Sequence, residues 1–182
     1  MKKVFIFFSD GIEEIEAIAP IDILRRAELD VVTVSISDSK TVTGAHGIKV
    51  EADQLFTETT FGENDYYVLP GGYDGMLNLS AHQGVNELLT KQHNAGKKLA
   101  AICASPSVLG KLGILEGKEA ICYPGFEGNL TGATISKNSV VEDGNVITGK
   151  GPGVAVQFEL KIVESLKGKE TASQVSDSLM LN

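Results

Sequence analysis

Three short runs of consecutive apolar residues limit the folds that this chain can adopt. They are Val4–Phe8, Tyr66–Leu69 and Leu99–Ile102, and each ends at small or turn-forming residues. Runs of four or five apolar residues are typical of parallel strands covered on both faces, because all of their side chains are buried. Helical patterns separate the runs. A repeated strand–helix–strand order predicts an α/β fold, a three-layer sandwich with a mostly parallel sheet.

The remaining elements fit the same architecture. We expect helices over Glu13–Arg26, Val85–His93, Pro106–Leu112 and Val154–Leu166, strands over Asp30–Ile36, Ala120–Cys122, Ser139–Val141 and Val146–Thr148, and a hairpin joining Thr41–Val42 to Ile48–Val50. In the first helix, Ile15 and Ile18 begin a three-residue apolar repeat that predicts a buried stripe. Pro20 predicts a kink or a restart of that helix. In sheets of this kind the ligand site lies beyond the carboxyl ends of the strands.

Length and composition narrow the functions that fit. With 182 residues we expect one domain over 1–182. The formal net charge of −8 argues against nucleic acid and anionic membranes as partners, because both select for clustered Lys and Arg. The first apolar run is too short for a signal peptide, and none approaches the roughly 20 residues of a membrane helix. Two cysteines cannot build a disulfide framework, so we expect a cytoplasmic protein with free thiols.

The sharpest local feature is the junction at Cys103, where an apolar strand runs directly into a helix start. Ser105 is a favourable N-cap and Pro106 a favourable first helical residue. This places Cys103 at a tight strand-to-helix turn, the cysteine counterpart of a nucleophile elbow, where the helix dipole would favour thiolate over thiol. The alternative is a buried core cysteine, because free cysteine is among the most buried residue types.

Two further features lie near predicted strand ends. Glu13, Glu14 and Glu16 crowd the start of the first helix, and they are either solvated acids or, for Glu16, a carboxyl that borders the buried stripe and points into the site. Gly71 and Gly72 follow Pro70 at a strand end. Their backbone N–H groups, together with that of Ala104, would bind a developing oxyanion, although on sequence alone the pattern favours an ordinary glycine turn.

The other polar residues carry weaker signals. His46, His82 and His93 are widely separated and share no metal-ligand spacing, so we expect no metal site, and only His46 lies in a turn that would reach the site. Cys122 is interpreted as a quiet second thiol, with an exchangeable disulfide to Cys103 as the alternative. The segment 149–153 lacks the spacing of phosphate and dinucleotide loops.

Five motifs in register resemble the ThiJ/PfpI superfamily, and within it the branch that contains the Parkinson-disease-linked protein deglycase and bacterial relatives. They are Gly11–Glu16, Pro20–Ala27, Val68–Gly72, Ala100–Ala104 and Gly151–Gly153, and the match runs from Lys3 to Leu181. The resemblance implies a flavodoxin-like sandwich, as in class I glutamine amidotransferases, and a homodimer. It also implies that Cys103 is the reactive cysteine, that the protonated carboxyl of Glu16 hydrogen-bonds its thiolate, and that Gly72 and Ala104 are backbone donors.

The sequence departs from parts of this superfamily. Ala104 stands where protease-like members have histidine, and no histidine follows His93, which argues against peptide and glutamine hydrolysis. Tyr123 stands where some deglycase relatives have a site histidine, and it would donate a proton or shape the pocket. His46 stands where the branch often has an arginine that reaches across the dimer. Gly71 and Pro152 complete the expected pocket.

The predicted function is a cysteine-dependent enzyme for small reactive carbonyls, of glyoxalase or deglycase type, that needs no cofactor. The Cys103 thiolate would attack a glyoxal or its adduct, and Glu16 would move the proton that yields a 2-hydroxy acid. The alternative is a redox sensor or stress-response chaperone, in which Cys103 is oxidised to sulfinic acid without turnover. A role in thiamine metabolism has no support in these residues.

Overall fold

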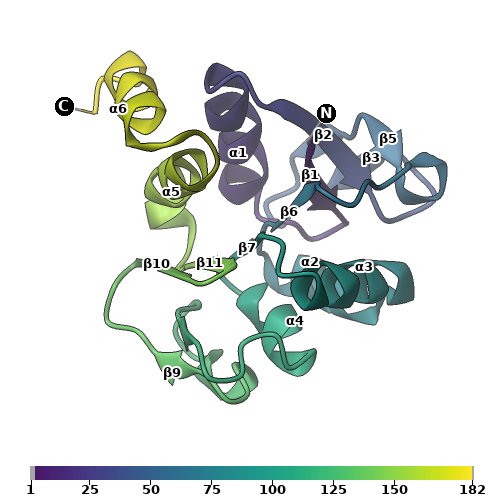
Figure 1. Cartoon of the computed structure of the whole chain (residues 1–182). Coiled ribbons are helices and arrows are strands. Elements are labelled where there is room, and N and C mark those ends of the chain that lie inside the picture. Colours follow the sequence, from purple (N-terminus) through teal and green to yellow (C-terminus); the bar gives the residue numbers. More distant parts are fainter. Residues whose placement is uncertain (1–2, 182) are drawn as a thin grey trace.

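The three apolar runs form the centre of a parallel sheet. The computed structural model of the protein describes residues 3–181, and across these residues the main sheet has seven strands in the order β10-β11-β7-β6-β1-β2-β5 (Figure 1). The bounds are β1 (Lys3–Phe8), β2 (Asp30–Ser35), β5 (Gln54–Leu55), β6 (Tyr66–Leu69), β7 (Leu99–Ile102), β10 (Val140–Asp143) and β11 (Val146–Gly149). Neighbours pair in parallel except β10 with β11. The predicted mostly parallel α/β sheet is therefore confirmed.

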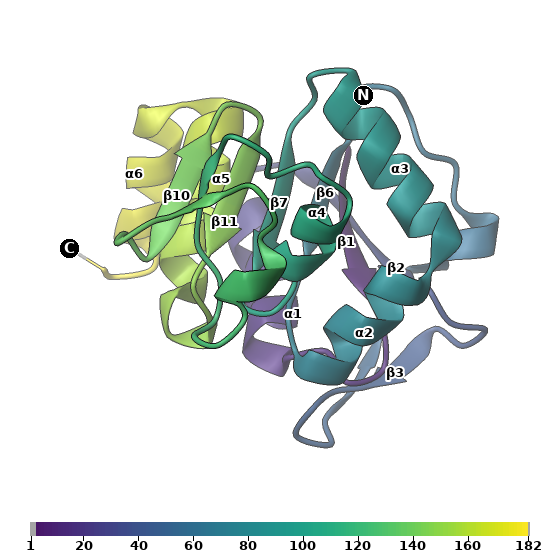
Figure 2. The same cartoon turned by 90° about the horizontal axis from the view of Figure 1, so that it is seen from below.

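Helices cover both faces of this sheet. On one side lie α1 (Glu14–Arg26), α5 (Ala155–Lys167) and α6 (Lys169–Ser178), and on the other α2 (Tyr73–Ala81), α3 (Gln83–Asn94) and α4 (Pro106–Lys111) (Figures 1 and 2). This arrangement confirms the flavodoxin-like, three-layer sandwich. The predicted hairpin is present as β3 (Thr41–Thr43) and β4 (Lys49–Glu51), and β8 (Glu119–Ala120) pairs with β9 (Thr134–Ile135).

Two strands and two helices escaped the sequence reasoning. Strands β5 and β9 are only two residues long each, and α2 contains Gly75, a residue that weakens a helical pattern. Helix α6 is almost entirely polar, and Val175 is its one buried residue. Packing against the adjacent α5, rather than a strong amphipathic pattern of its own, accounts for this last helix.

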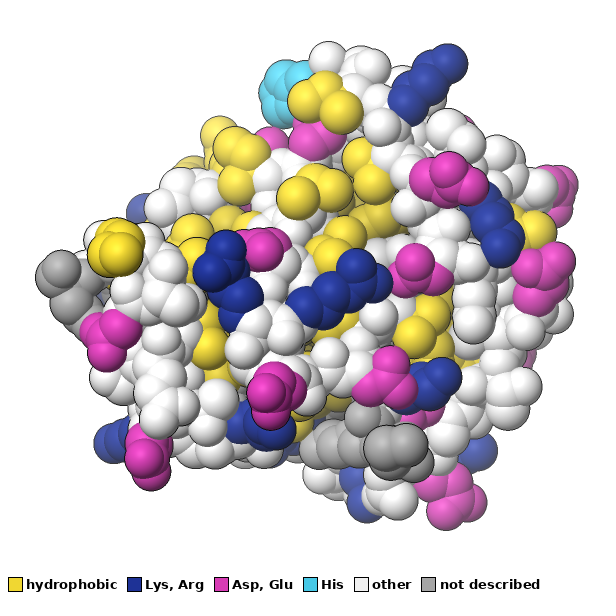
Figure 3. All heavy atoms as spheres, turned by 90° about the horizontal axis from the view of Figure 1, so that it is seen from above, with side chains coloured by type: hydrophobic (Ala, Val, Ile, Leu, Met, Phe, Trp, Pro, Cys, Tyr) yellow, Lys and Arg dark blue, Asp and Glu magenta, His cyan; other side chains and the backbone are white. Residues whose placement is uncertain are grey.

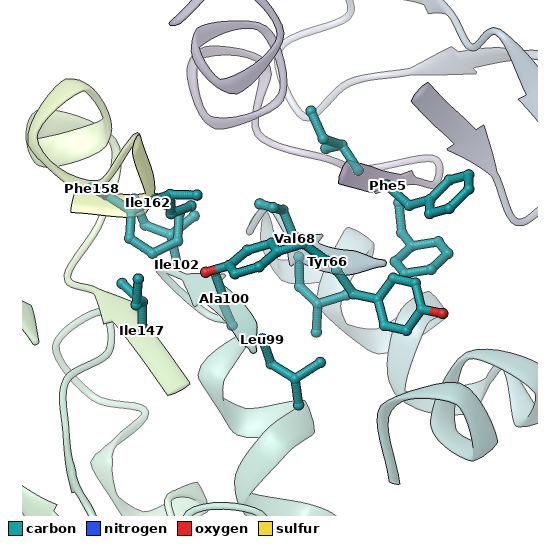
Figure 4. Packing of buried hydrophobic residues seen from close by; sticks show 14 of the residues in the cluster. Phe5, Tyr66, Val68, Leu99, Ala100, Ile102, Ile147, Phe158 and Ile162 are labelled. Carbon is teal, nitrogen blue, oxygen red and sulfur yellow. The ribbon is translucent and has the colours of Figure 1, made fainter. Parts of the chain in front are cut away.

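The core lies where strands β1, β6, β7 and β11 meet α5. Figure 4 shows Phe158 and Ile162 of α5 beside Ile102 and Ile147 of the neighbouring strands, and all four side chains are buried. Burying each such side chain stabilises the fold by about 1.5–3 kcal/mol. This core fixes the carboxyl ends of β6 and β7, where the candidate site lies.

Helix α1 buries a different face from the one that its isoleucines predict. Ile15 and Ile18 are 57% and 44% exposed, so the predicted buried stripe is wrong. The buried face instead runs through Glu16, Pro20 and Leu24, which recur every four residues and so lie on one side of the helix. The helix continues unbroken through Pro20, so the predicted restart does not occur, and only the hydrogen bond that proline cannot donate is lost.

The surface carries both signs of charge. On the face shown in Figure 3, Lys and Arg side chains alternate with Asp and Glu, and hydrophobic side chains lie between them. Within residues 3–181, none of the helices has the length and apolar character that crossing a membrane requires.

Two buried polar side chains, each without a hydrogen-bond partner among the described residues, interrupt the core beneath α1. Glu159 of α5 is 1% exposed, and its Oε2 has no hydrogen-bond partner among the described residues. The hydroxyl of Tyr66, equally buried and unpaired there, extends from β6 toward α5 (Figure 4). Burial and the nearby charge of Glu16 raise the pKa of Glu159 well above its ordinary value. Burial therefore favours the neutral, protonated form of Glu159 in the folded protein.

We predict that Glu159→Gln becomes progressively more stable than the wild type as the pH rises. Above about pH 4.3 the unfolded chain releases the Glu159 proton while the folded chain keeps it, so the wild type loses about 1.4 kcal/mol of stability per pH unit until the folded-state pKa is passed. Glutamine has no proton to release. Urea unfolding at pH 5 and pH 7 measures the difference in free energy of unfolding between the variant and the wild type, with Glu63→Gln on the exposed loop before β6 as the control. A difference that is the same at the two pH values contradicts this assignment.

Candidate active site

The site is built on a strained turn at the end of β7. Cys103 has φ +65°, in the left-handed region that residues other than glycine seldom adopt. Two backbone bonds hold the turn, from Cys103 N–H to the Gly149 carbonyl (2.9 Å) and from Tyr123 N–H to the Cys103 carbonyl (2.8 Å). The side chain is buried, with the residue 8% exposed. A cysteine that only fills a core needs no such backbone strain, so the conformation favours the nucleophile elbow over the core alternative.

Two backbone N–H groups point at the sulfur of Cys103. They belong to Gly72 and Ala104, and their hydrogen bonds act to lower the pKa of the thiol. Gly72 has φ +90°, and a Cβ on it would overlap the Gly11 carbonyl oxygen, so only glycine fits there. The structure thus brings together the two donors that the resemblance implies.

Glu16 reaches the sulfur from the first turn of α1. Glu13 caps this helix, because its side chain accepts the Glu16 N–H at 2.9 Å. The Glu16 side chain is buried, Oε2 accepts the Gly71 N–H at 2.9 Å, and the carboxyl also hydrogen-bonds the thiol of Cys103. Its Oε1 is buried with no partner that meets standard hydrogen-bond geometry within the described chain. The solvated alternative for Glu16 is therefore excluded.

Gly71 makes this approach possible. A Cβ at Gly71 would lie 2.5 Å from the Cβ of Cys103 and 2.5 Å from Oε2 of Glu16, well inside van der Waals contact. The missing side chain leaves the space in which the carboxyl and the thiol meet. The Gly71 carbonyl also accepts the Glu13 N–H at 3.1 Å, which ties the start of α1 to the end of β6.

Glu16 and Cys103 share one negative charge. Burial raises the pKa of Glu16 to about 7, although the Gly71 hydrogen bond acts in the opposite direction. Burial and the charge of Glu16 raise the pKa of Cys103 to about 12. Because two buried like charges in contact repel strongly, the pair loses one proton near pH 7 and keeps the second far into the alkaline range. At neutral pH a thiolate therefore forms only while the remaining proton sits on Glu16.

Two sequence expectations for this turn are wrong. The side chain of Ser105 does not cap α4, because its Oγ donates to the Pro70 carbonyl at 2.6 Å and so fastens the elbow to β6. The dipole of α4 does not lower the pKa of Cys103 below its ordinary value. This helix has only six residues, and burial together with the charge of Glu16 outweighs it.

Tyr123 and Pro152, two residues of the expected pocket, lie together, and the Tyr123 backbone bonds the Cys103 carbonyl. They line a pocket of about 290 Å³ together with Lys150, and Tyr123 is 46% exposed. A second pocket, of about 360 Å³, is lined by Tyr73 and Phe126. The sequence reasoning missed both of these rings, because neither is part of a strand pattern or of a motif.

His46 binds Glu14 of α1, away from the atoms that touch the Cys103 thiol. Its Nδ1 lies 2.7 Å from Oε2 of Glu14, and its backbone N–H donates to Oε1 at 2.7 Å. Burial acts to raise the pKa of Glu14, but these bonds outweigh it and lower the pKa to about 2. The partners are 32 residues apart, so sequence spacing gave no signal for this pair.

One group of side chains has a metal-like arrangement. Ligand atoms of Glu13, Glu14 and His46 lie within 4.8 Å of one another. Each of these carboxylates already accepts protein hydrogen bonds, those of Glu14 from the hairpin and that of Glu13 from α1. The arrangement is therefore accounted for as a helix cap and an ion pair, and the absence of a metal cofactor stays a prediction.

The second thiol takes no part in the contacts of the first. Cys122 is buried and, like Cys103, is a free cysteine. Burial and the charge of Glu127 raise its pKa to about 11. The disulfide alternative is thus not what the structure contains, and Cys122 fits the quiet thiol of the other interpretation.

Comparison of the sequence with known proteins finds a family model and several related proteins that match nearly the whole chain. The family model described as the DJ-1/PfpI family matches residues 2–165. Protein DJ-1 homolog B of Arabidopsis thaliana is 40% identical over 182 residues, which are 99% of this chain and 42% of that protein, so the chain spans less than half of that relative. The Glutathione-independent glyoxalase DJR-1.2 of Caenorhabditis elegans is 34% identical over 171 residues, covering 93% of this chain and 90% of that protein.

The fold comparison agrees. The crystal structure of Drosophila melanogaster DJ-1beta superposes with a TM-score of 0.91 at 34% sequence identity, covering 99% of this chain and 98% of that one. The likeness therefore extends through the whole described sandwich, including the strand ends that carry the site.

Proposed function

This chain belongs to the DJ-1/PfpI family, and on that premise we propose that it is a cysteine-dependent enzyme that converts small reactive carbonyls to 2-hydroxy acids. The observation that carries the proposal is the contact between Glu16 and Cys103, with a carboxyl whose pKa is about 7 beside the thiol. A proton-carrying group with a pKa near the working pH is what such an isomerisation needs. The relative named as a glyoxalase supports the same reading.

The first step is attack by sulfur on an aldehyde. With its proton on Glu16, the Cys103 thiolate adds to the aldehyde carbon of methylglyoxal and forms a hemithioacetal oxyanion. The N–H groups of Gly72 and Ala104 already point at the sulfur, and they are placed to hold negative charge as it moves to the adjacent oxygen. Glu16 then donates its proton to that oxygen.

Glu16 carries the proton of the second step. As a carboxylate it removes the hydrogen of the former aldehyde carbon and returns it to the neighbouring carbonyl carbon. The hydroxyl proton of the hemithioacetal passes to the neighbouring oxygen, which gives a 2-hydroxyacyl thioester on Cys103. Water hydrolyses the thioester and releases the acid and the free thiol. The balance is one methylglyoxal and one water to one lactate, with no oxidant, metal or organic cofactor.

The free thiols support the cytoplasmic location that the sequence predicts.

We predict lactate release from methylglyoxal by the purified protein. Cys103→Ser abolishes turnover, because the nucleophile is lost. Glu16→Ala lowers kcat by about 10²–10⁴-fold, the usual contribution of a positioned acid or base. Cys122→Ser is the matched control and keeps the wild-type rate, since that thiol is buried and is not among the groups that act on the Cys103 thiol. Enzymatic lactate determination measures all four proteins.

Absence of turnover in the wild type, or equal turnover in all four proteins, overturns the proposal. In that case the redox alternative is read from the intact mass after mild peroxide. A rapid gain of two oxygens on Cys103 in the inactive protein would favour a sulfinate-forming sensor.

We also infer that the chain forms the homodimer that the family resemblance implies. Ile15 and Ile18 of α1 and Ile48 of the hairpin are exposed, and Ile48 N–H donates to Oε1 of Glu14, which brings the hairpin against the start of α1. Covering these side chains would stabilise the pairing.

We predict that light scattering of the wild-type protein gives twice the molar mass of one chain. The double variant Ile15→Glu, Ile18→Glu is expected to give the mass of one chain. The control Met180→Glu, on the exposed C-terminal segment, is expected to keep the mass of the wild type. A wild-type monomer contradicts this inference.

A further inference from the structure

We propose that Tyr73, Phe126 and Tyr123 form an aromatic rim that selects carbonyl substrates bearing a planar aromatic group. The proposal rests on the proposed function and names a substrate class for that site. The ring centroids of Tyr73 and Phe126 are 6.1 Å apart, and those of Phe126 and Tyr123 are 6.4 Å apart, so the three rings form one continuous row.

Both ends of this rim are attached to the backbone that surrounds the sulfur. Tyr73 directly follows Gly72, whose N–H hydrogen-bonds the thiol of Cys103. Tyr123 donates its own N–H to the Cys103 carbonyl at 2.8 Å, and Phe126 N–H bonds the Tyr123 carbonyl at 3.1 Å. The chain itself therefore attaches two of the three rings directly to the backbone that surrounds the sulfur.

Two of the three rings of the rim are open to solvent. Most of the seven phenylalanines and four tyrosines of the chain pack in the interior, whereas Tyr73 is 61% and Tyr123 46% exposed. Exposed aromatic side chains gathered beside a nucleophile offer faces and edges for stacking with another ring. Phe126 is half-buried and packs against the core, so it anchors the row, while the two tyrosine rings are left available to a ligand.

The space beside the rim matches the size of a ring. Tyr73 and Phe126 line the pocket of about 360 Å³, and Tyr123 lines the one of about 290 Å³. A protein cavity of about 150 Å³ already accommodates benzene. The class of substrate is therefore an aryl glyoxal, in which a phenyl ring replaces the methyl group of methylglyoxal. The reaction is unchanged: phenylglyoxal and water give mandelate, and the hydrogen moves from the aldehyde carbon to the carbonyl carbon.

The test compares two substrates in two rim variants. We expect Tyr73→Ala to lower kcat/KM for phenylglyoxal about tenfold, the effect of one lost aromatic stacking contact, while kcat/KM for methylglyoxal stays within twofold. Tyr73→Phe keeps the ring and restores phenylglyoxal turnover. Met180→Ala, at an 88% exposed residue of the C-terminal segment, is the control for loss of an exposed apolar side chain. An equal change for both substrates, or no change for either, overturns the proposal.

A binding measurement separates this proposal from the proposed function. In the Cys103→Ser protein, which cannot turn over, we expect mandelate to bind about tenfold more tightly than lactate, and Tyr73→Ala to remove that preference. NMR titration measures both ligands. If methylglyoxal is not turned over and mandelate is still preferred, the rim stands and the proposed function falls. If mandelate and lactate bind equally, or neither binds, the rim proposal is wrong whatever the turnover.

Discussion

The contact between the Glu16 carboxyl and the Cys103 thiol is the interaction on which the rest of the site depends. Burial makes a negative charge costly on either group, and each makes the charge on the other more costly. The result is one shared charge and one shared proton. That proton can leave the sulfur without leaving the site, so a nucleophile and an acid are produced together by a single transfer.

The sandwich keeps these two groups together. Cys103 lies at the end of β7 and Glu16 in the first turn of α1, and the loop after β6 passes between them. That loop contains Gly71, which leaves room for the carboxyl, and Gly72, whose positive φ turns its N–H toward the sulfur. Ser105 and Glu13 tie the flanking segments to the same loop. Three elements distant in the sequence thus meet because parallel strands end at the same edge of the sheet.

Much of this arrangement could be predicted from the sequence, because apolar runs and turn residues report local structure directly. The strand into Cys103 and the glycines after Pro70 were found in this way. The buried face of α1 could not be predicted in this way. A hydrophobic pattern gives Ile15 and Ile18 more weight than a carboxyl, but both isoleucines are exposed and the Glu16 carboxyl is buried. Pairs such as His46 with Glu14 depend on tertiary contact alone. The pKa of Cys103 could not be predicted either, because its direction follows from burial and from the charge of a distant residue.

The most direct test of the shared charge is the pH dependence of iodoacetamide labelling at Cys103, measured by mass spectrometry. The account predicts a midpoint near pH 7 in the wild type, below the value of about 8.5 for a free cysteine, because the first proton of the pair is lost there. Glu16→Leu removes the group that takes up the thiol proton and raises the midpoint to at least the value of about 8.5 for a free cysteine, because burial then acts on the thiol alone. Gly71→Ala, which pushes the two groups apart, raises it in the same direction, whereas Gly153→Ala, in open space, leaves it unchanged. A wild-type midpoint at or above about 8.5, or the same midpoint in Glu16→Leu, would contradict the account.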